Sequence, residues 1–299
     1  MSQLSFEGVQ PHADAHPGRS AAPLKTQLLK WIGNKQRFAH EICGLFPSDF
    51  GTYYEPFLGS AAVLATLAPK SAVASDALGP LVEIWQALRS QPSTIKSWYR
   101  ERWLRITPEG KIACYEAVKA SYNRTPNAAD LLFISRACYG GVVRFRRRDG
   151  AISTPCGAHN PVRPEAFDRR VDLWHGRTRG TVFLHSDFEP VMDQARRGDL
   201  VYCDPPYTHT QAILYGAQGF DLARLLATIE RCKSRGVYVA LSIDGTKKSG
   251  DLLCEVPIPG GLFEREAFVN CGRSMLRRFQ MRGESLESEE VRDRLLLTY

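Results

Sequence analysis

The sequence predicts an α/β fold in which a mostly parallel sheet is interrupted by a helical insertion. In the first and last thirds of the chain, short apolar runs typical of strands alternate with amphipathic segments typical of helices. Between them, residues 81–139 show only helical patterns, with breaks at Pro92, Pro108 and Pro126. The simplest arrangement is one α/β domain made from two separated parts of the chain.

The first part of the sheet is expected to form a βαβ unit. The apolar spacing predicts a short helix over residues 36–46, a strand at 52–55, a helix at 60–67 and a second strand at 71–75. Residues 1–23, which are rich in Gly, Pro, His, Ser and Ala, are expected to form a flexible leader outside the fold.

The strand pattern returns after a basic hairpin. Residues 142–154 alternate around an Asp149-Gly150 turn, which predicts a β-hairpin. Beyond it we expect strands at residues 181–185, 200–203 and 236–242, and helices at residues 188–197 and 222–235.

The bulk composition is that of a folded globular protein with an anionic partner. Of the 299 residues, 43% are hydrophobic and 24% are charged, which is ordinary for a globular chain. This length accommodates one large domain, which we assign to residues 24–80 and 161–299, with an insertion at residues 81–160. The formal net charge of +7 favours a polyanion such as nucleic acid, although charge alone is weak evidence.

The cysteine and histidine spacings predict no metal site and no redox pair. The eight cysteines include no CxxC motif, and the seven histidines include no HxH or HExxH pattern. We expect mostly buried thiols in a reducing compartment. The sequence shows no secretory signal and no apolar run long enough to cross a membrane, so a cytoplasmic location is expected.

The most informative segment is an apolar strand that runs into Asp204, Pro205, Pro206 and Tyr207. The two prolines fix φ and remove backbone donors, so the Asp204 carboxylate and nearby carbonyls become acceptors in a stiff loop. Such acceptors suit an amino group with two hydrogens, and Tyr207 offers an aromatic face on which a planar base can stack. The alternative is a strand stopped by prolines before a surface turn. The preceding strand and the residue order favour a catalytic site.

A second candidate site lies in the predicted βαβ unit. Gly59 and Ser60 lie between a strand and a helix, where the backbone can approach a ligand and free N–H groups can bind a carboxylate. Asp76 ends the next strand, and an acidic residue in that place can accept two ribose hydroxyls. Each residue alone could belong to an ordinary turn or helix cap. The combination favours a nucleoside cofactor.

The densest positive run of the chain lies on the predicted hairpin, at Arg144, Arg146, Arg147 and Arg148. A charge run is usually a solvated face. Here aromatic residues such as Tyr139 flank the run, and a ribbon of this composition can press against phosphates or enter a groove where arginine reads guanine. We therefore expect these five residues to bind nucleic acid.

Taken in order, these motifs resemble the Dam-like N6-adenine DNA methyltransferases, with the motif order of the alpha type. Residues 30–35 are similar to the family's Lys-Trp-x-Gly-Gly-Lys element, and residues 55–61 to its Glu-Pro-Phe-x-Gly-Ser-Gly cofactor loop. Residues 133–145 are similar to the segment with which these enzymes contact their target DNA. Ser-Asp-Phe at residues 186–188 and the Asp-Pro-Pro-Tyr motif follow at family-like positions, so the resemblance runs from about residue 25 to the end.

The resemblance implies a Rossmann-like S-adenosylmethionine-dependent methyltransferase sheet, with residues 81–160 as its target-recognition subdomain. The enzyme would transfer a methyl group from S-adenosyl-L-methionine to N6 of an adenine flipped out of double-stranded DNA. Asp204 and the Pro205 carbonyl would accept hydrogen bonds from the amino group, and Pro206 and Tyr207 would complete the catalytic motif. The resemblance implies no metal and no membrane. It implies a monomer or weak dimer and is compatible with a companion restriction enzyme.

The resemblance also implies a set of residues around the cofactor. Trp31 and Lys35 would contact its methionine end, and Phe57 would pack beside it. Asp187 and Phe188 would hold the adenine ring, with a helix N-cap as the alternative role for Asp187. The complete set is Trp31, Lys35, Glu55, Phe57, Gly59, Ser60, Asp76, Asp187, Phe188 and Asp204.

Other activities share much of this chemistry. Methylation of cytosine N4 would use the same acceptors, and RNA could take the place of DNA. A DNA-binding relative without catalysis would keep the scaffold and the basic hairpin.

Several positions differ from the family pattern. Asn34 and Ala61 replace glycines of the first two elements. Where enzymes that read GATC tend to carry asparagines, this chain has Ser135, Gly140 and Arg146. Because base reading depends on the donors and acceptors of such side chains, GATC cannot be transferred as the target sequence.

Overall fold

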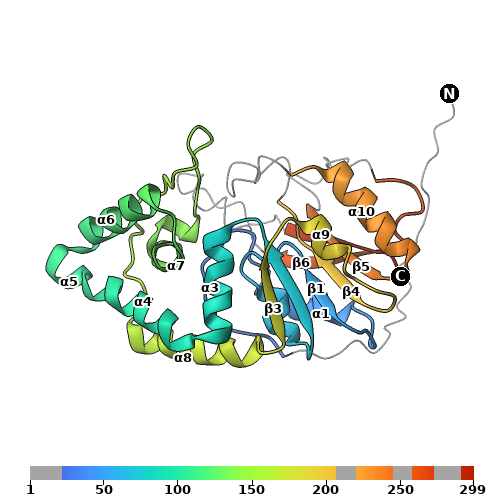
Figure 1. The fold of residues 1–299 in the computed structure, drawn as a ribbon, viewed down its shortest axis with the longest axis horizontal. Helices are drawn as coiled ribbons and strands as arrows, with labels where there is room; N and C mark the ends of the chain where they lie inside the picture. The colour runs from blue at the N-terminus through green and yellow to red at the C-terminus, as the bar shows by residue number, and fades with distance from the viewer. Residues whose placement is uncertain (1–21, 207–219, 245–257, 273–290) are drawn as a thin grey trace.

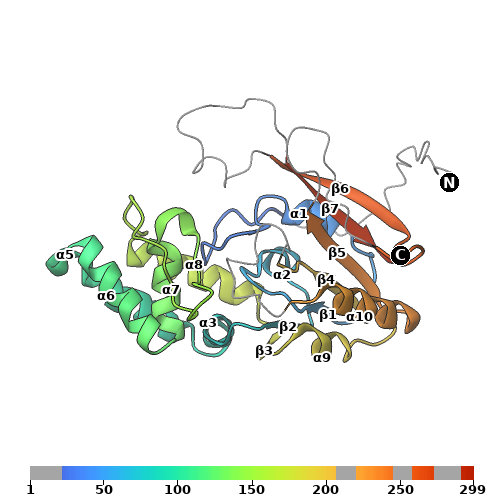
Figure 2. The same ribbon diagram turned by 90° about the horizontal axis from the view of Figure 1, so that it is seen from above.

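The computed structural model describes residues 22–206, 220–244, 258–272 and 291–299 (Figure 1). Almost all of the predicted leader, and Tyr207 of the predicted catalytic motif, lie outside the described residues. The described part forms a sheet with helices on both faces and further helices that extend to one side (Figure 1, Figure 2). None of the helices in these ranges has the length and apolar character needed to cross a membrane.

Seven strands form the sheet, in the order β3-β2-β1-β4-β5-β7-β6. They are β1 (Tyr53–Glu55), β2 (Ala72–Asp76), β3 (Thr181–His185), β4 (Leu200–Cys203), β5 (Tyr238–Asp244), β6 (Arg265–Gly272) and β7 (Val291–Leu297). The five strands from β3 to β5 pair in parallel, and β7 runs antiparallel to both of its neighbours. The strand order reverses between β1 and β4. Open α/β sheets bind ligands beyond the carboxyl ends of the strands at such a point.

Alternate residues of the central strands pack on opposite faces of the sheet. Tyr53 and Tyr202 belong to one hydrophobic cluster, whereas their neighbours Tyr54 and Val201 belong to another. Short helices cover both faces (Figure 2): α1 (Ala39–Gly44) and α2 (Ala62–Leu67) the first, α9 (Phe188–Met192) and α10 (Leu222–Ser234) the second. The three layers confirm the α/β fold class that the sequence predicts.

Six α-helices and one short 3-10 helix (Tyr139–Gly141) lie between β2 and β3 in the sequence, and most of the α-helices extend away from the sheet (Figure 1). The α-helices are α3 (Gly79–Ser90), α4 (Pro92–Leu104), α5 (Ile106–Glu109), α6 (Lys111–Arg124), α7 (Ala128–Ala137) and α8 (Pro164–Arg177). Pro92 is the first residue of α4. A backbone N–H in this position has no partner within the helix, so proline costs no hydrogen bond there. Pro126 precedes Asn127, whose side chain caps α7 by accepting the Asp130 N–H at 2.9 Å. These prolines therefore mark helix boundaries, as expected.

The helices of this insertion share one hydrophobic core with the sheet. The Trp85 ring on α3 lies 5.7 Å from the Trp174 ring on α8 and 6.2 Å from the Phe183 ring on β3, between centroids. Both tryptophans are fully buried, and the same cluster continues into α6 and α7. The predicted insertion, together with α8 just beyond its end at residue 160, is therefore packed directly against the edge of the sheet through α3 and α8.

Some elements differ from the sequence predictions. α8, β6 and β7 are present in the structure but were not predicted from the sequence. The helix predicted over residues 188–197 ends at Met192, because the Gln194 and Ala195 N–H groups donate to carbonyls three residues back instead of four, at 3.2 Å each. The Arg196 N–H then donates to the Asp199 carboxylate at 2.8 Å. The other predicted strands and helices agree with the structure to within a few residues.

The segment predicted as a β-hairpin turns back on itself without forming continuous strands. Within it, Phe145 and Ile152 form an isolated antiparallel bridge. Side chains satisfy part of the remaining backbone: the Thr154 hydroxyl donates to the Val142 carbonyl at 2.7 Å and accepts the Arg144 N–H at 2.9 Å. Such bonds compete with the backbone hydrogen bonds of a strand ladder. The segment is therefore a loop that side-chain hydrogen bonds hold at its base.

We expect Thr154→Val to loosen the base of this hairpin loop. Valine has the same shape but leaves two backbone groups without their partner in a buried place, so the free energy of unfolding should fall by about 1–3 kcal/mol. Urea denaturation measures this change, and hydrogen exchange at the Arg144 amide should become faster. Thr154→Ser keeps the hydroxyl and is the matched control. Equal stability of the two variants would contradict this role of the hydroxyl.

Candidate active site

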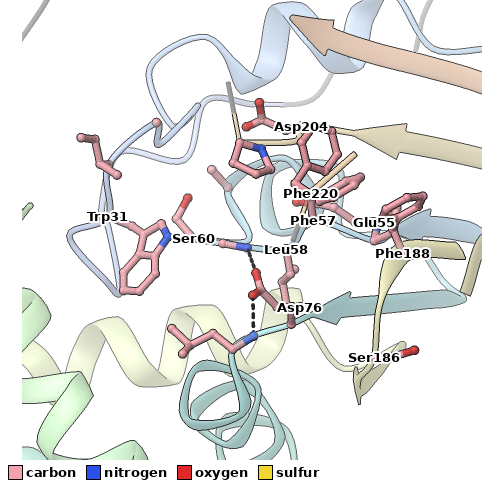
Figure 3. Close-up of a pocket in the computed structure, with 18 of the residues that line it drawn as sticks. Trp31, Glu55, Phe57, Leu58, Ser60, Asp76, Ser186, Phe188, Asp204 and Phe220 are labelled. Atoms are coloured by element: carbon pink, nitrogen blue, oxygen red, sulfur yellow. Dashed lines mark hydrogen bonds between the residues drawn. The ribbon is translucent and has the colours of Figure 1, made fainter. Parts of the chain in front are cut away.

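A cavity of about 570 Å³ lies beyond the carboxyl ends of β1, β2 and β4, where the strand order reverses (Figure 3). Its volume lies in the range of small-molecule sites. In the described part of the chain, no group of three or more His, Cys, Asp or Glu residues is arranged to hold a metal ion. All the residues predicted to bind the cofactor line the cavity: Trp31, Lys35, Glu55, Phe57, Gly59, Ser60, Asp76, Asp187, Phe188 and Asp204.

The loop after β1 makes a tight turn at the edge of the cavity. Gly59 has a φ of 46° and Ala61 a φ of 54°, both in the left-handed region. A Cβ atom on Gly59 would lie 3.4 Å from the Trp31 ring, so the glycine allows a close approach between the two segments. Ala61 stands where the family pattern has glycine, and an L-residue in this conformation is strained by about 1–2 kcal/mol. The turn therefore forms with alanine at a conformational cost.

Asp76, the last residue of β2, ties this loop to the next one. Its carboxylate accepts the Gly59 N–H at 3.0 Å through one oxygen and the Leu78 N–H at 3.0 Å through the other (Figure 3). The Gly59 N–H is thus already engaged, contrary to the expectation that it would be free for a ligand. Burial raises the pKa of Asp76, and hydrogen bonds from the Gly59, Leu78 and Ala77 N–H groups oppose this shift. A carboxylate offers about four lone-pair sites, so it keeps acceptor capacity for a ligand hydroxyl.

Glu55, the last residue of β1, is a buried carboxyl in the floor of the cavity. The Tyr53 hydroxyl donates to its Oε2 at 2.6 Å. Its pKa is raised to about 8 by burial, against the effect of the Tyr53 hydrogen bond, and the nearby charge of Asp204 adds to the rise. Glu55 is therefore mostly neutral at pH 7.

Lys35 and Asp204 form an ion pair beside Glu55. The Lys35 Nζ lies 3.2 Å from the Asp204 Oδ1, and only 5% of Lys35 is exposed. The resemblance placed Lys35 at the methionine end of a cofactor, whereas the structure brings it to the predicted catalytic carboxylate. Pro206 also lines the cavity, and Pro205 lies between Asp204 and Pro206 in the chain. The loop that carries Asp204 and the two prolines is thus held in place by a buried cation, Lys35.

Aromatic rings form the end of the cavity opposite Trp31 (Figure 3). The Phe57 ring is stacked on the Phe188 ring at 5.2 Å, and the Phe220 ring meets the Phe57 ring edge-on at 5.8 Å. Asp187 caps α9 by accepting the Glu189 N–H at 3.1 Å, which confirms its alternative role as an N-cap. These rings provide flat apolar surfaces suited to a planar heterocycle.

The sequence reasoning missed Phe220 and Arg224. Phe220 lines the cavity, and the Arg224 guanidinium lies 4.4 Å from the centre of the Phe188 ring while also pairing with Asp187. The only signal for Phe220 is an aromatic residue just before a predicted helix, which carries no chemistry by itself. Arg224 lies on the polar side of that helix and looks like an ordinary surface charge in the sequence.

The predicted nucleic-acid residues lie on the exposed loop next to the cavity. Tyr139 is 45% exposed, and all four arginines of the run are exposed. Between them, Phe145 is buried and lines the cavity together with Gly150. The Arg146 Nη2 lies 2.9 Å from the Asp149 carboxylate, which also pairs with Arg148 at 3.3 Å. The basic hairpin thus borders the cavity, although the arginines themselves do not line it.

Comparisons of the chain with a family model and with individual known proteins point to the same family. The model for the D12 class N6 adenine-specific DNA methyltransferase family matches residues 31–265. The chain is 26% identical over 229 residues to the Type II methyltransferase M1.LlaDCHI of Lactococcus lactis subsp. cremoris, an alignment that covers 72% of this chain and 80% of that protein. It is 27% identical over 229 residues to the Retron Ec67 DNA adenine methylase of Escherichia coli, covering 73% and 77% of the two chains.

A third relative is much longer than this chain. The DNA N-6-adenine-methyltransferase of Escherichia phage P1 is 26% identical over 243 residues, which cover 78% of this chain but only 32% of the phage protein. The family match includes every residue that lines the cavity. Together these findings confirm the resemblance seen in the motifs: the chain belongs to the D12 class of N6 adenine-specific DNA methyltransferases.

Proposed function

We propose that this family member uses the cavity to transfer a methyl group from S-adenosylmethionine to N6 of an adenine flipped out of double-stranded DNA. The observation that carries this proposal is the convergence of a tight glycine loop, an acidic strand end and an Asp-Pro-Pro acceptor loop on one cavity. Flipping is required because the amino group of a stacked, paired base is out of reach. The chemistry needs no metal, and one copy of the chain carries the whole cavity.

The residues present fit this cofactor. The Asp76 oxygens have free lone pairs for ribose hydroxyls, and the Phe57 and Phe188 rings suit the adenine ring. When bound, S-adenosylmethionine supplies a methyl group carried on a positively charged sulfur.

Asp204 and the Pro205 carbonyl would accept hydrogen bonds from the adenine amino group. The lone pair of this nitrogen is delocalised into the ring, so the nitrogen is a poor nucleophile. Acceptors placed beside it become more favourable as positive charge develops on nitrogen during the transfer. The Lys35 ion pair fixes the position of one of these acceptors, and orientation of the two reactants supplies much of the rate.

DNA would reach the cavity along the basic hairpin. Exposed arginines next to the cavity can contact phosphates and position a duplex. We assign target recognition to residues 81–160, which include this hairpin, and the catalytic domain to residues 24–80 and 161–299. The Type II methyltransferase among the relatives makes a companion restriction enzyme a reasonable partner to seek.

Asp204→Ala should lower methyl transfer from radiolabelled cofactor to DNA by about 100-fold or more, because it removes one charged acceptor from the transition state. Mass spectrometry of digested wild-type product should show N6-methyladenine and no N4-methylcytosine. Asp193→Ala, an exposed aspartate outside the cavity, is the matched control and should keep full activity. Undiminished transfer by Asp204→Ala would overturn the mechanism.

Lys35→Met should lower kcat by about 30-fold or more, because it removes the cation that holds the Asp204 carboxylate in place, and misplacing a catalytic group by about 1 Å can cost about 100-fold. The affinity for S-adenosylmethionine, measured by calorimetry, should change much less. Lys35→Arg keeps the charge and should recover part of the rate. If Lys35→Met instead weakens cofactor binding and leaves kcat intact, Lys35 serves the methionine end of the cofactor, as the resemblance alone implied.

Arg147→Ala should weaken DNA binding at every sequence and should reduce the slope of log affinity against log salt by about 1, as expected for one lost phosphate contact. Fluorescence anisotropy over a range of salt concentrations measures both effects. Arg235→Ala, on α10's carboxyl end and paired with Asp193, is the control and should change neither. Loss of affinity in both variants alike would argue against a specific role for the hairpin.

A further inference from the structure

The backbone at the base of the hairpin loop places two cysteines directly opposite each other. Cys138, which follows α7, and Cys156 form an isolated antiparallel bridge. The residue after each cysteine donates its N–H to the carbonyl of the residue before the other cysteine, at 2.9 Å from Tyr139 and at 2.8 Å from Gly157. In this pattern the two cysteines are the pair that exchanges no hydrogen bonds of its own.

Such a pair has the backbone spacing that a disulfide needs. Facing residues of this kind have Cα atoms about 4.5 Å apart and side chains on the same face of the ribbon. A disulfide requires Cα atoms about 4.4–6.8 Å apart. Gly157 allows the two segments to approach this closely, because a Cβ atom on it would lie 2.9 Å from the Cys138 carbonyl oxygen.

The two sulfur atoms are thiols in the structure and are turned toward different acceptors. The Cys138 Sγ donates to the Ser135 carbonyl at 3.9 Å, and the Cys156 Sγ donates to the Gly157 carbonyl at 3.6 Å. A thiol is a weak donor, so rotation of these side chains costs little. Rotation about χ1 changes the direction of each sulfur and leaves the backbone in place.

The third thiol of this region, Cys114 on α6, does not take part in the pairing. Its Sγ donates to the Arg102 carbonyl at 3.4 Å. Among the residues that the structure describes, these cysteines and their neighbours do not form a group of three or more ligands that could hold a metal ion. The arrangement therefore favours a two-cysteine bond over a metal site.

The two thiols differ in their access to a dissolved oxidant. Cys138 is 3% exposed, whereas Cys156 is partly exposed. Burial raises the pKa of both thiols, and at Cys156 the nearby charge of Lys111 opposes the rise. Because the thiolate is the reactive form, the pair reacts slowly at neutral pH, and an oxidant meets Cys156 first.

We infer that Cys138 and Cys156 are a covalent modification site, which a peroxide oxidises to a disulfide across the base of the hairpin loop. Peroxide transfers one oxygen to the Cys156 thiol, which becomes a sulfenic acid, and one water is released. The Cys138 sulfur then attacks the Cys156 sulfur, and the S–O bond breaks. The hydroxide leaves with the Cys138 proton as a second water, and the two thiols have lost two electrons to the peroxide.

This site is separate from the candidate active site, because neither cysteine lines the cavity. The bond would join the two ends of the segment 139–155, which carries Tyr139 and the four exposed arginines. Closing a loop covalently restricts its open states. The hydrogen bonds at the base of the loop should then break less often. The inference concerns the hairpin loop itself and holds whether or not the proposed function is correct.

Peptide mapping of the full chain tests the bond directly. The protein is treated with excess hydrogen peroxide, its remaining thiols are alkylated, and it is digested with trypsin without reduction. Cleavage after Arg144 separates the two cysteines, so mass spectrometry should find their peptides linked. Hydrogen exchange at the Tyr139 and Gly157 amides should slow by about tenfold or more after oxidation. Dithiothreitol should reverse both changes.

Cys156→Ser exchanges a thiol for a hydroxyl at a partly exposed position. It should give no linked peptides and no change of exchange on oxidation. Cys114→Ala removes the other thiol of the region and is the matched control, which should behave as wild type. Oxidation of wild-type Cys156 to a sulfinic acid while Cys138 stays a thiol would overturn the inference. So would two unreacted thiols, or a link from either cysteine to Cys114.

Discussion

The parallel pairing of β1 with β4 is the contact on which the whole site depends. Tyr53 pairs with Leu200 and Tyr54 with Val201, so two strands separated in the sequence by the whole insertion end side by side. The strands thereby carry Glu55 and Asp204 to the same edge of the sheet. A shift of this register by one residue would turn both sets of side chains to the opposite faces. Side chains on both faces of β1 and β4 are buried in the two hydrophobic clusters, so the packing of both layers holds this register and, under the proposed function, the geometry of the site.

This pairing also creates an electrostatic problem, because it places two carboxyl groups together where water is largely excluded. The protein solves the problem in two different ways. A buried ammonium group pairs with Asp204, whereas burial raises the pKa of Glu55 and so favours its neutral form. Under the proposed function, the first solution gives a fixed acceptor for the amino group of the target base. The second avoids a further negative charge in the floor of the cavity.

Much of this site could be predicted from the sequence, because its signals are local: a strand that ends in Asp76, a glycine between a strand and a helix, and an acidic residue before two prolines. Contacts between distant segments could not be predicted. Nothing local links Lys35 to Asp204, or Phe220 to Phe57, since these contacts depend on how the strands pair. β6 and β7 were missed for a similar reason, because their alternation is interrupted by charged residues. α8 could have been found, since Phe167, Val171 and Trp174 have helical spacing and are fully buried.

The positions that differ from GATC-reading enzymes are separated by the structure into two kinds. Ser135 is completely buried on α7, and its hydroxyl donates to the Leu132 carbonyl at 2.8 Å, so it cannot reach a base without unfolding that turn of the helix. Arg146 is exposed on the hairpin, and Gly140, which is also exposed, has no side chain with which to read a base. Under the proposed function, the choice of sequence around the adenine therefore falls on the hairpin and not on α7. Because Phe145 of this hairpin also lines the cavity, a DNA sequence that changes the position of the hairpin would change the wall of the cavity, so recognition and catalysis share one short segment.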